Sequence, residues 1–596
     1  MAYFHASGMK MGHFSSASHK HIVYQLFVRL FSNTRTKNKP YGTIRENGCG
    51  KFDDITPVVL KALRDFGVTH IWYTGVLEHS SVTAYPEHGI EADDPRIVKG
   101  RAGSPYAVRD YYDVDADLSN DPGKRIEEFV AMIDRTHAAG MKAIIDFIPN
   151  HLGRNYHSDL NPGKFPDFGT HDNREVLFSP ENDFLYLPHQ SFRPPADYQP
   201  LGGLKLSSAM QHFSENPARV TGNDVYSAAP SSQDWFETVK LNFGVNPHPP
   251  HECHFDPIPP VWQKLLDILL YWSAKGVDGF RCDMAEMVPA EFWEWVIPCV
   301  KTHYPEVLFI AEIYKPELYL RYLEKGYFDY LYDKVSLYDT LLAVLKGQTA
   351  ADDITHCTRS VEYHSEKMLS FMENHDEERL ANFASVGNPL AVIPAMYVCA
   401  LISKGPVMIY FGQESGVRAE ENVGFAGSRQ RTSIFDYCSV PEHLRWYNKG
   451  KCDGGQFTEE QQQLYRAYKE LLKLAADSPA IANGGFYDLQ YVNRHHQSEG
   501  FDERYIYAFI RHAKEQKLLI VVNFNPSSPY AVHVKIPDDA LMNIGLSGKK
   551  SIRYKILNNE PLAGEIKTDK LHVQENRFSG IPLQLEPMSA KVVELY

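Results

Sequence analysis

The sequence lacks the features that mark a membrane-spanning or disulfide-bonded protein. No apolar run approaches the roughly 18 residues that a membrane helix needs, so the chain is not expected to span a bilayer. The eight cysteines are scattered, none forms a C-x-x-C pair, and several fall inside apolar runs. Buried, reduced thiols are therefore expected in place of a disulfide scaffold, which fits a reducing compartment.

Positive charge is also in short supply. The chain has 61 lysine and arginine residues against 75 aspartate and glutamate residues, and its formal net charge is −14. Because basic groups supply most of the affinity for nucleic acid, no nucleic-acid partner is expected and a neutral substrate is favoured. Residues 1–20 are polar and His-rich without a continuous apolar segment, so we expect a tag-like or disordered tail, no signal peptide and a cytoplasmic location.

From residue 22 to residue 411, short β-prone runs alternate with segments of helical periodicity. Val59, Leu63 and Phe66, for example, have helical spacing and end at Gly67. One apolar run alone could equally be buried helix, but sustained alternation predicts an α/β fold, a closed (β/α)8 TIM barrel. The predicted strands span residues 22–28, 69–73, 142–147, 279–283, 308–312, 328–332, 367–373 and 406–411.

Two segments depart from this alternation. The first, after the third strand, is rich in Pro, Gly, Asn, Ser and aromatic residues and is too long for an unstructured loop, so we expect an inserted subdomain that lines the cleft. The second follows the barrel, where β-prone runs at 505–511, 517–524, 531–536, 552–556 and 582–595 predict an all-β sandwich domain. The expected divisions are a tail at 1–20, barrel at 21–151 and 247–490, the insertion at 152–246 and the β-sandwich at 491–596.

Polar side chains stand where four of the predicted barrel strands end, in segments 146–151, 279–283, 311–314 and 371–376. The carboxyl ends of barrel strands open on one face, so groups from distant sequence can meet there. A lone aspartate at a strand end is usually a cap or a loop residue. Four such segments together indicate a catalytic site.

Asp283 and Glu312 have the placement that cleavage of a glycosidic bond requires, because one carboxyl group attacks the anomeric carbon and the other protonates the departing oxygen. They close neighbouring predicted strands, and the nearby carboxylate is expected to raise the pKa of the acid, Glu312. Arg281, two residues before Asp283 on the same strand face, is expected to hold that carboxylate ionised. Polar groups for sugar hydroxyls would come from His151, His375 and Asp376.

In this order, the four segments resemble the four signature regions of the α-amylase family of glycoside hydrolases and transglycosylases, and the resemblance covers nearly the whole chain. It implies Asp283 as nucleophile, Glu312 as general acid/base and Asp376 as the third catalytic carboxylate. It also implies retaining hydrolysis of α-linked glucose oligomers or polymers through a covalent glycosyl-Asp intermediate. The substrate-binding residues that it implies are Tyr106, Asp146, His151, Arg281 and His375.

One departure from the family pattern lies just after the nucleophile. Many members carry a Lys-His pair there that serves the leaving-group subsites and a calcium ion, where this chain has Glu286 and Met287. The acceptor side of the cleft is therefore expected to differ, and we expect no cofactor and no tightly held metal. Calcium remains the alternative through Asn150, whose position binds calcium in some members, although orientation of His151 is its favoured role.

Several alternatives stay open from the sequence. Water reaching the intermediate gives hydrolysis, whereas a sugar acceptor gives transglycosylation or isomerisation, and the sequence does not decide between them. A non-catalytic carbohydrate-binding or partner module would predict missing carboxylates, and none is missing. The terminal β domain has no chemical motif of its own, so packing against the barrel is expected and starch binding is the alternative. The oligomeric state is not readable.

Overall fold

The structure, a computed structural model, describes most of the chain. The described residues are 19–161, 164–204, 212–421, 423–425, 430–495, 497–558, 563–568, 571 and 580–596. The predicted tail at 1–20 lies outside them apart from its last two residues.

Eight parallel strands form the barrel that the sequence predicts. The strands are β1 (Ile22–Phe27), β2 (His70–Thr74), β5 (Lys142–Phe147), β10 (Gly279–Cys282), β11 (Leu308–Ala311), β12 (Tyr330–Tyr332), β13 (Met368–Leu369) and β14 (Val407–Tyr410). Their hydrogen-bonded order is β13-β12-β11-β10-β5-β2-β1-β14. A parallel bridge between Ser370 and Val407 joins the two ends of this sheet, with Ser370 N donating to Pro406 O at 3.0 Å. The prediction of a closed barrel is confirmed.

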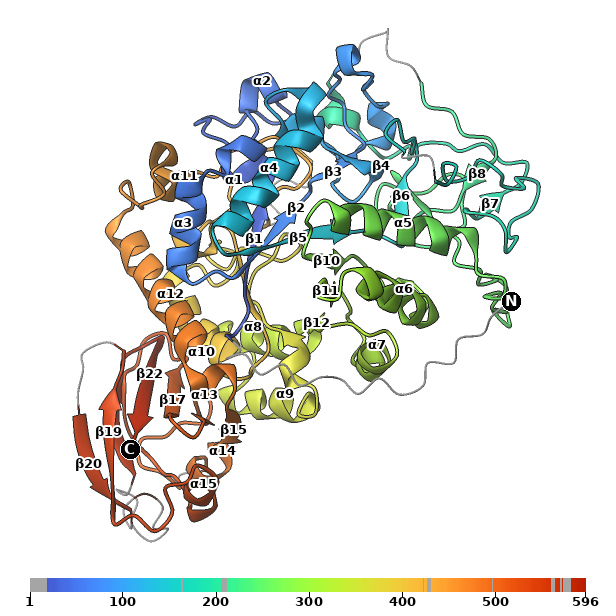
Figure 1. Cartoon of the computed structure of the whole chain (residues 1–596). Helices are drawn as coiled ribbons and strands as arrows, with labels where there is room; N and C mark the ends of the chain where they lie inside the picture. The colour runs from blue at the N-terminus through green and yellow to red at the C-terminus, as the bar shows by residue number, and fades with distance from the viewer. Residues whose placement is uncertain are drawn as a thin grey trace.

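The barrel strands are apolar almost throughout because helices cover their outer face and side chains fill the interior. In β5 every residue but Lys142 is buried. Figure 1 shows the covering helices around the strands. The main ones are α3 (Pro57–Phe66), α4 (Arg125–Ala138), α5 (Pro260–Ala274), α6 (Ala290–His303), α7 (Tyr319–Glu324), α8 (Asp339–Leu345), α10 (Ile393–Leu401) and α12 (Glu459–Asp477).

Helix α3 illustrates how local sequence sets these boundaries. The Thr56 side chain accepts the N–H of Val59 and Pro57 occupies the first helical position, so the helix begins there. It ends at Gly67, whose φ of 106° a residue with a side chain rarely adopts. The predicted helical run is therefore present, and it carries the chain back to the start of β2.

Two barrel strands differ from the prediction by two or more residues at one end. β12 begins at Tyr330, not at residue 328, and β13 ends at Leu369, not at residue 373. Beyond the Ser370 bridge the chain leaves the sheet for the loop that carries His375 and Asp376. A β-prone run predicts extended backbone, but only a neighbouring strand in register makes it a sheet strand.

The inserted segment after β5 is held by short antiparallel pairs. β6 (His151–Gly153) pairs with β9 (Thr238–Lys240), and β7 (Tyr186–Leu187) pairs with β8 (Ala218–Arg219). The segment shares a small apolar cluster with Ile97 and Val98, and the buried Arg154 guanidinium lies 2.7 Å from Glu215. It thus forms a compact wall beside the C-terminal end of the barrel (Figure 1).

The C-terminal domain is antiparallel. Its larger sheet has the order β15-β16-β17-β22-β19-β20, and a second pair joins β18 to β21. The strands are β15 (Gly485–Asp488), β16 (Ile506–His512), β17 (Lys517–Asn523), β18 (Tyr530–Val534), β19 (Ser551–Ile556), β20 (Ala563–Lys567), β21 (Ile581–Leu585) and β22 (Ser589–Leu595). The sheet thus begins before the expected boundary at residue 491. The predicted run 582–595 is wrong as one strand, because Pro587 and the positive φ of Met588 turn the chain between β21 and β22.

One face of this larger sheet packs on the barrel. Tyr507, Phe509 and Ile520 belong to the same apolar core as the barrel helices, whereas alternate residues such as Ala508 and Val521 belong to the core between the two β layers. Arg511 bridges the two parts by donating to Ile402 O and to carbonyls at 480–484. The domain is joined to the barrel through a shared apolar core.

Two expectations drawn from composition can be compared with the structure. None of the described helices has the length and apolar character needed to cross a membrane. All eight cysteines are free thiols. Cys282, between Arg281 and Asp283 on β10, is fully buried, and burial raises the pKa of its thiol well above the usual value.

Candidate active site

The predicted site residues meet at the C-terminal end of the barrel. Asp283 and Glu312 directly follow the neighbouring strands β10 and β11. Five of the predicted residues line one cavity of about 570 Å³: Tyr106, His151, Asp283, Glu312 and Asp376. Asp146, Arg281 and His375 contact these residues from beneath the cavity wall. Asn150 lies behind His151 and donates to its ring at 3.1 Å.

Arg281 is the centre of charge in this site. Its guanidinium is fully buried, with Nη1 2.7 Å from Asp283 and Nη2 2.8 Å from Glu312. Nη1 also lies 3.6 Å from Asp146, and Nε donates to the Tyr332 hydroxyl at 3.2 Å. One fixed cation thus orients three carboxyl groups from adjacent strands, a task suited to the planar fork of arginine.

The two carboxyl groups of the pair differ in their hydrogen bonds. Glu312 accepts from Met284 N at 2.7 Å and from the Tyr314 hydroxyl at 2.6 Å, besides its contact with Arg281. Asp283 accepts from Arg281, and its Oδ2 has no hydrogen-bond partner among the described residues.

Burial and then the Glu312 carboxylate raise the pKa of Asp283 well above its usual value, against the effect of Arg281. The raised pKa that the sequence predicts for Glu312 stays a prediction. More donors reach Glu312 than Asp283, so Asp283 is the less supported of two like charges. The two groups titrate as a pair that retains one proton to higher pH than an isolated aspartate would.

Tyr106 and His375 form a stacked pair under the cavity. Their ring centroids are 5.2 Å apart at 21°, and the Tyr106 hydroxyl lies 2.5 Å from His375 Nε2 and donates to Asp146 at 3.3 Å. Gln25 donates its amide to His375 Nδ1 at 2.8 Å, which fixes the orientation of the ring. Burial opposes ionisation of Asp376, but His375, 3.0 Å away, lowers the pKa of Asp376 to about 2.

His151 forms another part of the wall. Burial, helped by the Lys240 ammonium, lowers the pKa of His151 to about 3, so the ring is neutral at physiological pH. It packs against Trp235 of the insertion, with ring centroids 5.1 Å apart. Asn150 donates both to this ring and to Gly222 O at 2.9 Å. The amide therefore holds the imidazole in place.

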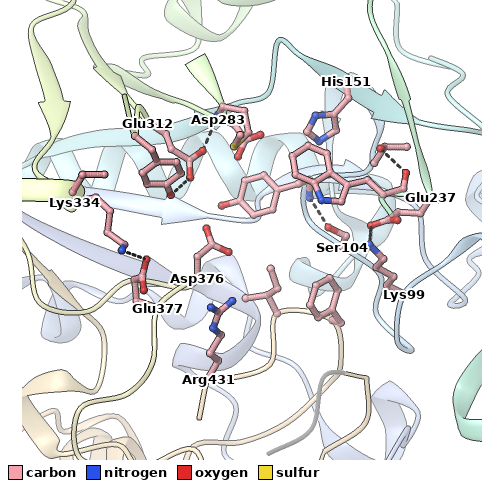
Figure 2. Close-up of a pocket in the computed structure, with 18 residues that line it drawn as sticks. Lys99, Ser104, His151, Glu237, Asp283, Glu312, Lys334, Asp376, Glu377 and Arg431 are labelled. Carbon is pink, nitrogen blue, oxygen red and sulfur yellow. Dashed lines mark hydrogen bonds and ion pairs between the residues drawn. The ribbon is translucent and has the colours of Figure 1, made fainter. Parts of the chain in front are cut away.

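Several cavity residues were not singled out from the sequence. Figure 2 shows the Lys99–Glu237 pair at one end of the cavity, the Lys334–Glu377 pair at the other and Arg431 near Asp376. Lys99 Nζ lies 2.9 Å from Glu237, and Lys334 Nζ lies 3.5 Å from Glu377. None of these residues ends a predicted strand, so no periodic signal marks them. The wall is completed by Ser104, Trp235, Thr238, Met284, Tyr314, Val335, Ile434 and Phe435.

The surroundings of Asn150 bear on the calcium alternative. Calcium takes six to eight oxygen ligands. Asn150 offers one buried oxygen, Oδ1, without a partner among the described residues. Beside it on β9, opposite His151, Lys240 brings a buried ammonium that lies 3.1 Å from Asp224. In the part of the chain that the structure describes, no group of three or more His, Cys, Asp or Glu is arranged to hold a metal.

Comparison with known sequences and structures adds to this geometry. Residues 25–172 and 257–436 match the family model described as the alpha amylase catalytic domain, and residues 500–595 match the alpha amylase C-terminal all-beta domain. The gap between the two catalytic matches contains most of the inserted segment.

Two curated relatives illustrate the range of similar proteins. Neopullulanase 2 of Thermoactinomyces vulgaris is 21% identical over 87% of this chain and 71% of its own length. Cyclomaltodextrin glucanotransferase of Geobacillus stearothermophilus is 22% identical over 86% of this chain and 60% of its own length. This chain therefore spans well under the full length of both relatives.

Solved structures share the fold. The crystal structure of alpha-amylase from Geobacillus thermoleovorans in complex with acarbose superposes with a TM-score of 0.58 at 18% identity, covering 97% of this chain and 98% of that one. The maltogenic alpha-amylase AmyB from Thermotoga neapolitana gives 0.58 at 17% identity over 96% of this chain and 98% of its own. Barrel, insertion and terminal β domain therefore occur together elsewhere.

Proposed function

This chain belongs to the α-amylase family, and on that premise we propose that it is a retaining glycoside hydrolase acting on α-linked glucose oligomers or polymers. The observation that carries the proposal is the pair Asp283 and Glu312, held by the single guanidinium of Arg281 at the wall of one cavity. Two such carboxyl groups are what a double displacement at an anomeric carbon requires.

In the proposed reaction Asp283 attacks the anomeric carbon while Glu312 gives its proton to the glycosidic oxygen, which leaves with its sugar. Positive charge that develops on the ring favours an ionised Asp283, so the proton of the coupled pair passes to Glu312 when substrate is bound. Water then transfers a proton to Glu312 and attacks the same carbon, which releases Asp283. Two inversions at one centre give retention.

The rest of the site would bind and distort the sugar. Tyr106 offers an aromatic face, and neutral His151 and the ring of His375 offer hydrogen bonds. Ionised Asp376 accepts from hydroxyl groups across the cavity from the pair (Figure 2). Asp146 is proposed to act through Tyr106 and Arg281, which it contacts. We propose that the reaction needs no calcium ion and no other cofactor; the buried Lys240 ammonium, on the residue paired with His151, supports the proposal for calcium.

Transglycosylation is the second candidate. The relatives include a cyclomaltodextrin glucanotransferase and, at 36% identity over 101 residues, an alpha-1,4-glucan:maltose-1-phosphate maltosyltransferase from Cereibacter sphaeroides. In this reaction a sugar hydroxyl replaces water in the second step. A non-catalytic carbohydrate-binding role is the third, less favoured candidate.

One experiment separates these candidates. The purified protein is incubated with maltotriose and longer maltooligosaccharides, and products are separated by chain length while proton NMR follows the first anomer formed. Shorter sugars that appear first as the α anomer support retaining hydrolysis, and products longer than the substrate support transfer. Products that appear first as the β anomer refute the double displacement, and no turnover of any α-glucan refutes the enzymatic proposal.

We further propose that the protein works in a reducing, cytoplasmic environment on a neutral oligosaccharide partner, without nucleic acid or membrane. The eight free thiols and the net charge of −14 support this.

A further inference from the structure

Glu286 links the two loops that carry the catalytic pair. It lies in the short turn Ala285–Met287 that follows Asp283, and its side chain is 9% exposed. Its Oε2 accepts the backbone N–H of Tyr314 at 2.8 Å and that of Lys315 at 3.0 Å. One carboxylate oxygen of the loop after β10 therefore fixes the backbone of the loop after β11.

Tyr314 carries this constraint to the acid/base. Its hydroxyl donates to Glu312 Oε1 at 2.6 Å, while the other oxygen, Oε2, is held by Met284 N and Arg281. Burial and the adjacent Glu312 raise the pKa of the Tyr314 hydroxyl well above its usual value, so it remains a donor at every working pH. Both oxygens of Glu312 thus accept a hydrogen bond, and the donor at Oε1 is the Tyr314 hydroxyl.

We propose that Glu286 is a positioning residue for the acid/base Glu312 and acts through Tyr314. The inference rests on the proposed function, in which Glu312 delivers a proton to the leaving oxygen. Without Glu286, two backbone N–H groups lose their acceptor and the backbone under Tyr314 is free to shift. The hydroxyl then leaves Oε1, and the Glu312 carboxyl can rotate away from the glycosidic oxygen.

A misplaced Glu312 carboxyl can be recognised by comparing substrates with different leaving groups. Proton delivery matters for a sugar leaving group and little for 4-nitrophenolate or fluoride, which leave without a proton. A misplaced Glu312 therefore lowers kcat/KM more on maltotriose than on a maltoside with an activated leaving group. Loss of the hydrogen bond from Tyr314 also removes a donor that favours the ionised carboxylate, so the alkaline limb of the kcat/KM profile should move to higher pH.

The test compares Tyr314→Phe, Glu286→Ala, Glu286→Gln and the double variant Glu286→Ala/Tyr314→Phe. Tyr314→Phe should lower kcat/KM on maltotriose about 10- to 100-fold, lower it less than about threefold on 4-nitrophenyl maltoside, and raise the alkaline limb by about one pH unit. Glu286→Ala should show the same pattern. Glu286→Gln should behave like the wild type, because one amide oxygen can accept both N–H groups.

The double variant and one control test whether Glu286 acts through Tyr314. If Glu286 acts through Tyr314, Glu286→Ala should have no further effect on kcat/KM in the Tyr314→Phe background. Lys315→Ala removes an ammonium 3.8 Å from Glu286 Oε1 and keeps the backbone N–H that donates to Glu286, so it should behave as wild type. Melting temperatures establish that each variant is folded.

Three results would overturn the proposal. They are an unchanged alkaline limb in folded Glu286→Ala, an equal loss on maltotriose and 4-nitrophenyl maltoside, and independent effects of the two substitutions in the double variant. A wild-type protein without activity on either substrate refutes the proposed function itself, which distinguishes the two failures.

Discussion

Replacing Arg281 by methionine should show how far one cation sustains the whole site. Methionine keeps most of the volume and removes the charge that lies within 3.6 Å of Asp146, Asp283 and Glu312. Breaking a buried ion pair by deleting one partner costs about 3–5 kcal/mol, because the other charge stays buried. A protein of this size loses roughly 1 °C of Tm for each kcal/mol, so Tm should fall by about 3–5 °C at pH 8.

The loss should depend on pH, and its sign follows from linkage. Burial already raises the pKa of Asp146 and of Asp283 in the wild type. Without the guanidinium their folded-state pKa values lie still further above the unfolded ones, so their contribution to stability is lost as pH rises through the folded values. The Tm gap between wild type and variant should therefore narrow as pH falls from 8 to 5.

The measurement is a pair of melting curves at pH 5 and pH 8, with kcat/KM on maltotriose at both. Activity should fall at least about 100-fold, the usual effect of removing one preorganised charge-stabilising group. Arg511→Met is the matched control. Arg511 is also buried, and its partners among the described residues are all backbone carbonyls. Burial lowers its pKa to about 10, still above this pH range.

Arg511→Met should therefore destabilise the protein equally at pH 5 and pH 8 and leave the activity of the folded fraction unchanged. A Tm gap for Arg281→Met that is the same at both pH values would refute the charge-balance reasoning. Activity close to that of wild type would refute the central place of Arg281 in the site.

The remaining predictions concern the pair, a second acidic cluster and metal. Asp283→Asn should abolish turnover of every substrate, whereas Glu312→Gln should keep more activity on glycosyl fluorides than on maltotriose; substantial activity in Asp283→Asn contradicts the mechanism. Burial and the nearby Asp113 raise the pKa of Glu78 from 4.5 to about 9. The folded protein therefore keeps a proton that the unfolded chain releases, and the free energy of unfolding falls as pH rises from 4.5 toward 9. Glu78→Gln should therefore raise Tm at pH 8.5 and change it little at pH 5, and an equal change at both would contradict this. Excess chelator should leave Tm and turnover unchanged, because an ion that binds only the native state stabilises it by mass action; a fall of many degrees would show that a metal is held.

The order and type of the barrel elements could be predicted because they depend on local patterns. β5 was predicted to the residue, since a mostly apolar run flanked by helical periodicity has few other stable positions. The ends of β12 and β13 could not, because pairing with a neighbouring strand decides where a sheet strand stops. The turn at Met588 was missed for a related reason, since β propensity on both sides of Pro587 hides a local break.

The candidate site, like the fold, could be predicted only in part. Polar residues at strand ends marked Asp283, Glu312 and His375 because parallel strands must deliver their carboxyl ends to one face. No comparable rule marks Lys99, which meets Glu237 from a distant loop, since such contacts depend on the path of the whole chain.

Local patterns in the sequence are enough to predict the barrel, the face that holds the chemistry and the residues that converge there, because hydrophobic periodicity and strand-end polarity are local properties. How charge is shared within the site depends on the folded chain. Burial and the Glu312 carboxylate raise the pKa of Asp283, and the fold makes Glu286 a partner of the loop that holds Glu312. Proton affinity depends on burial and on neighbours a few ångströms away, and the folded chain alone sets both.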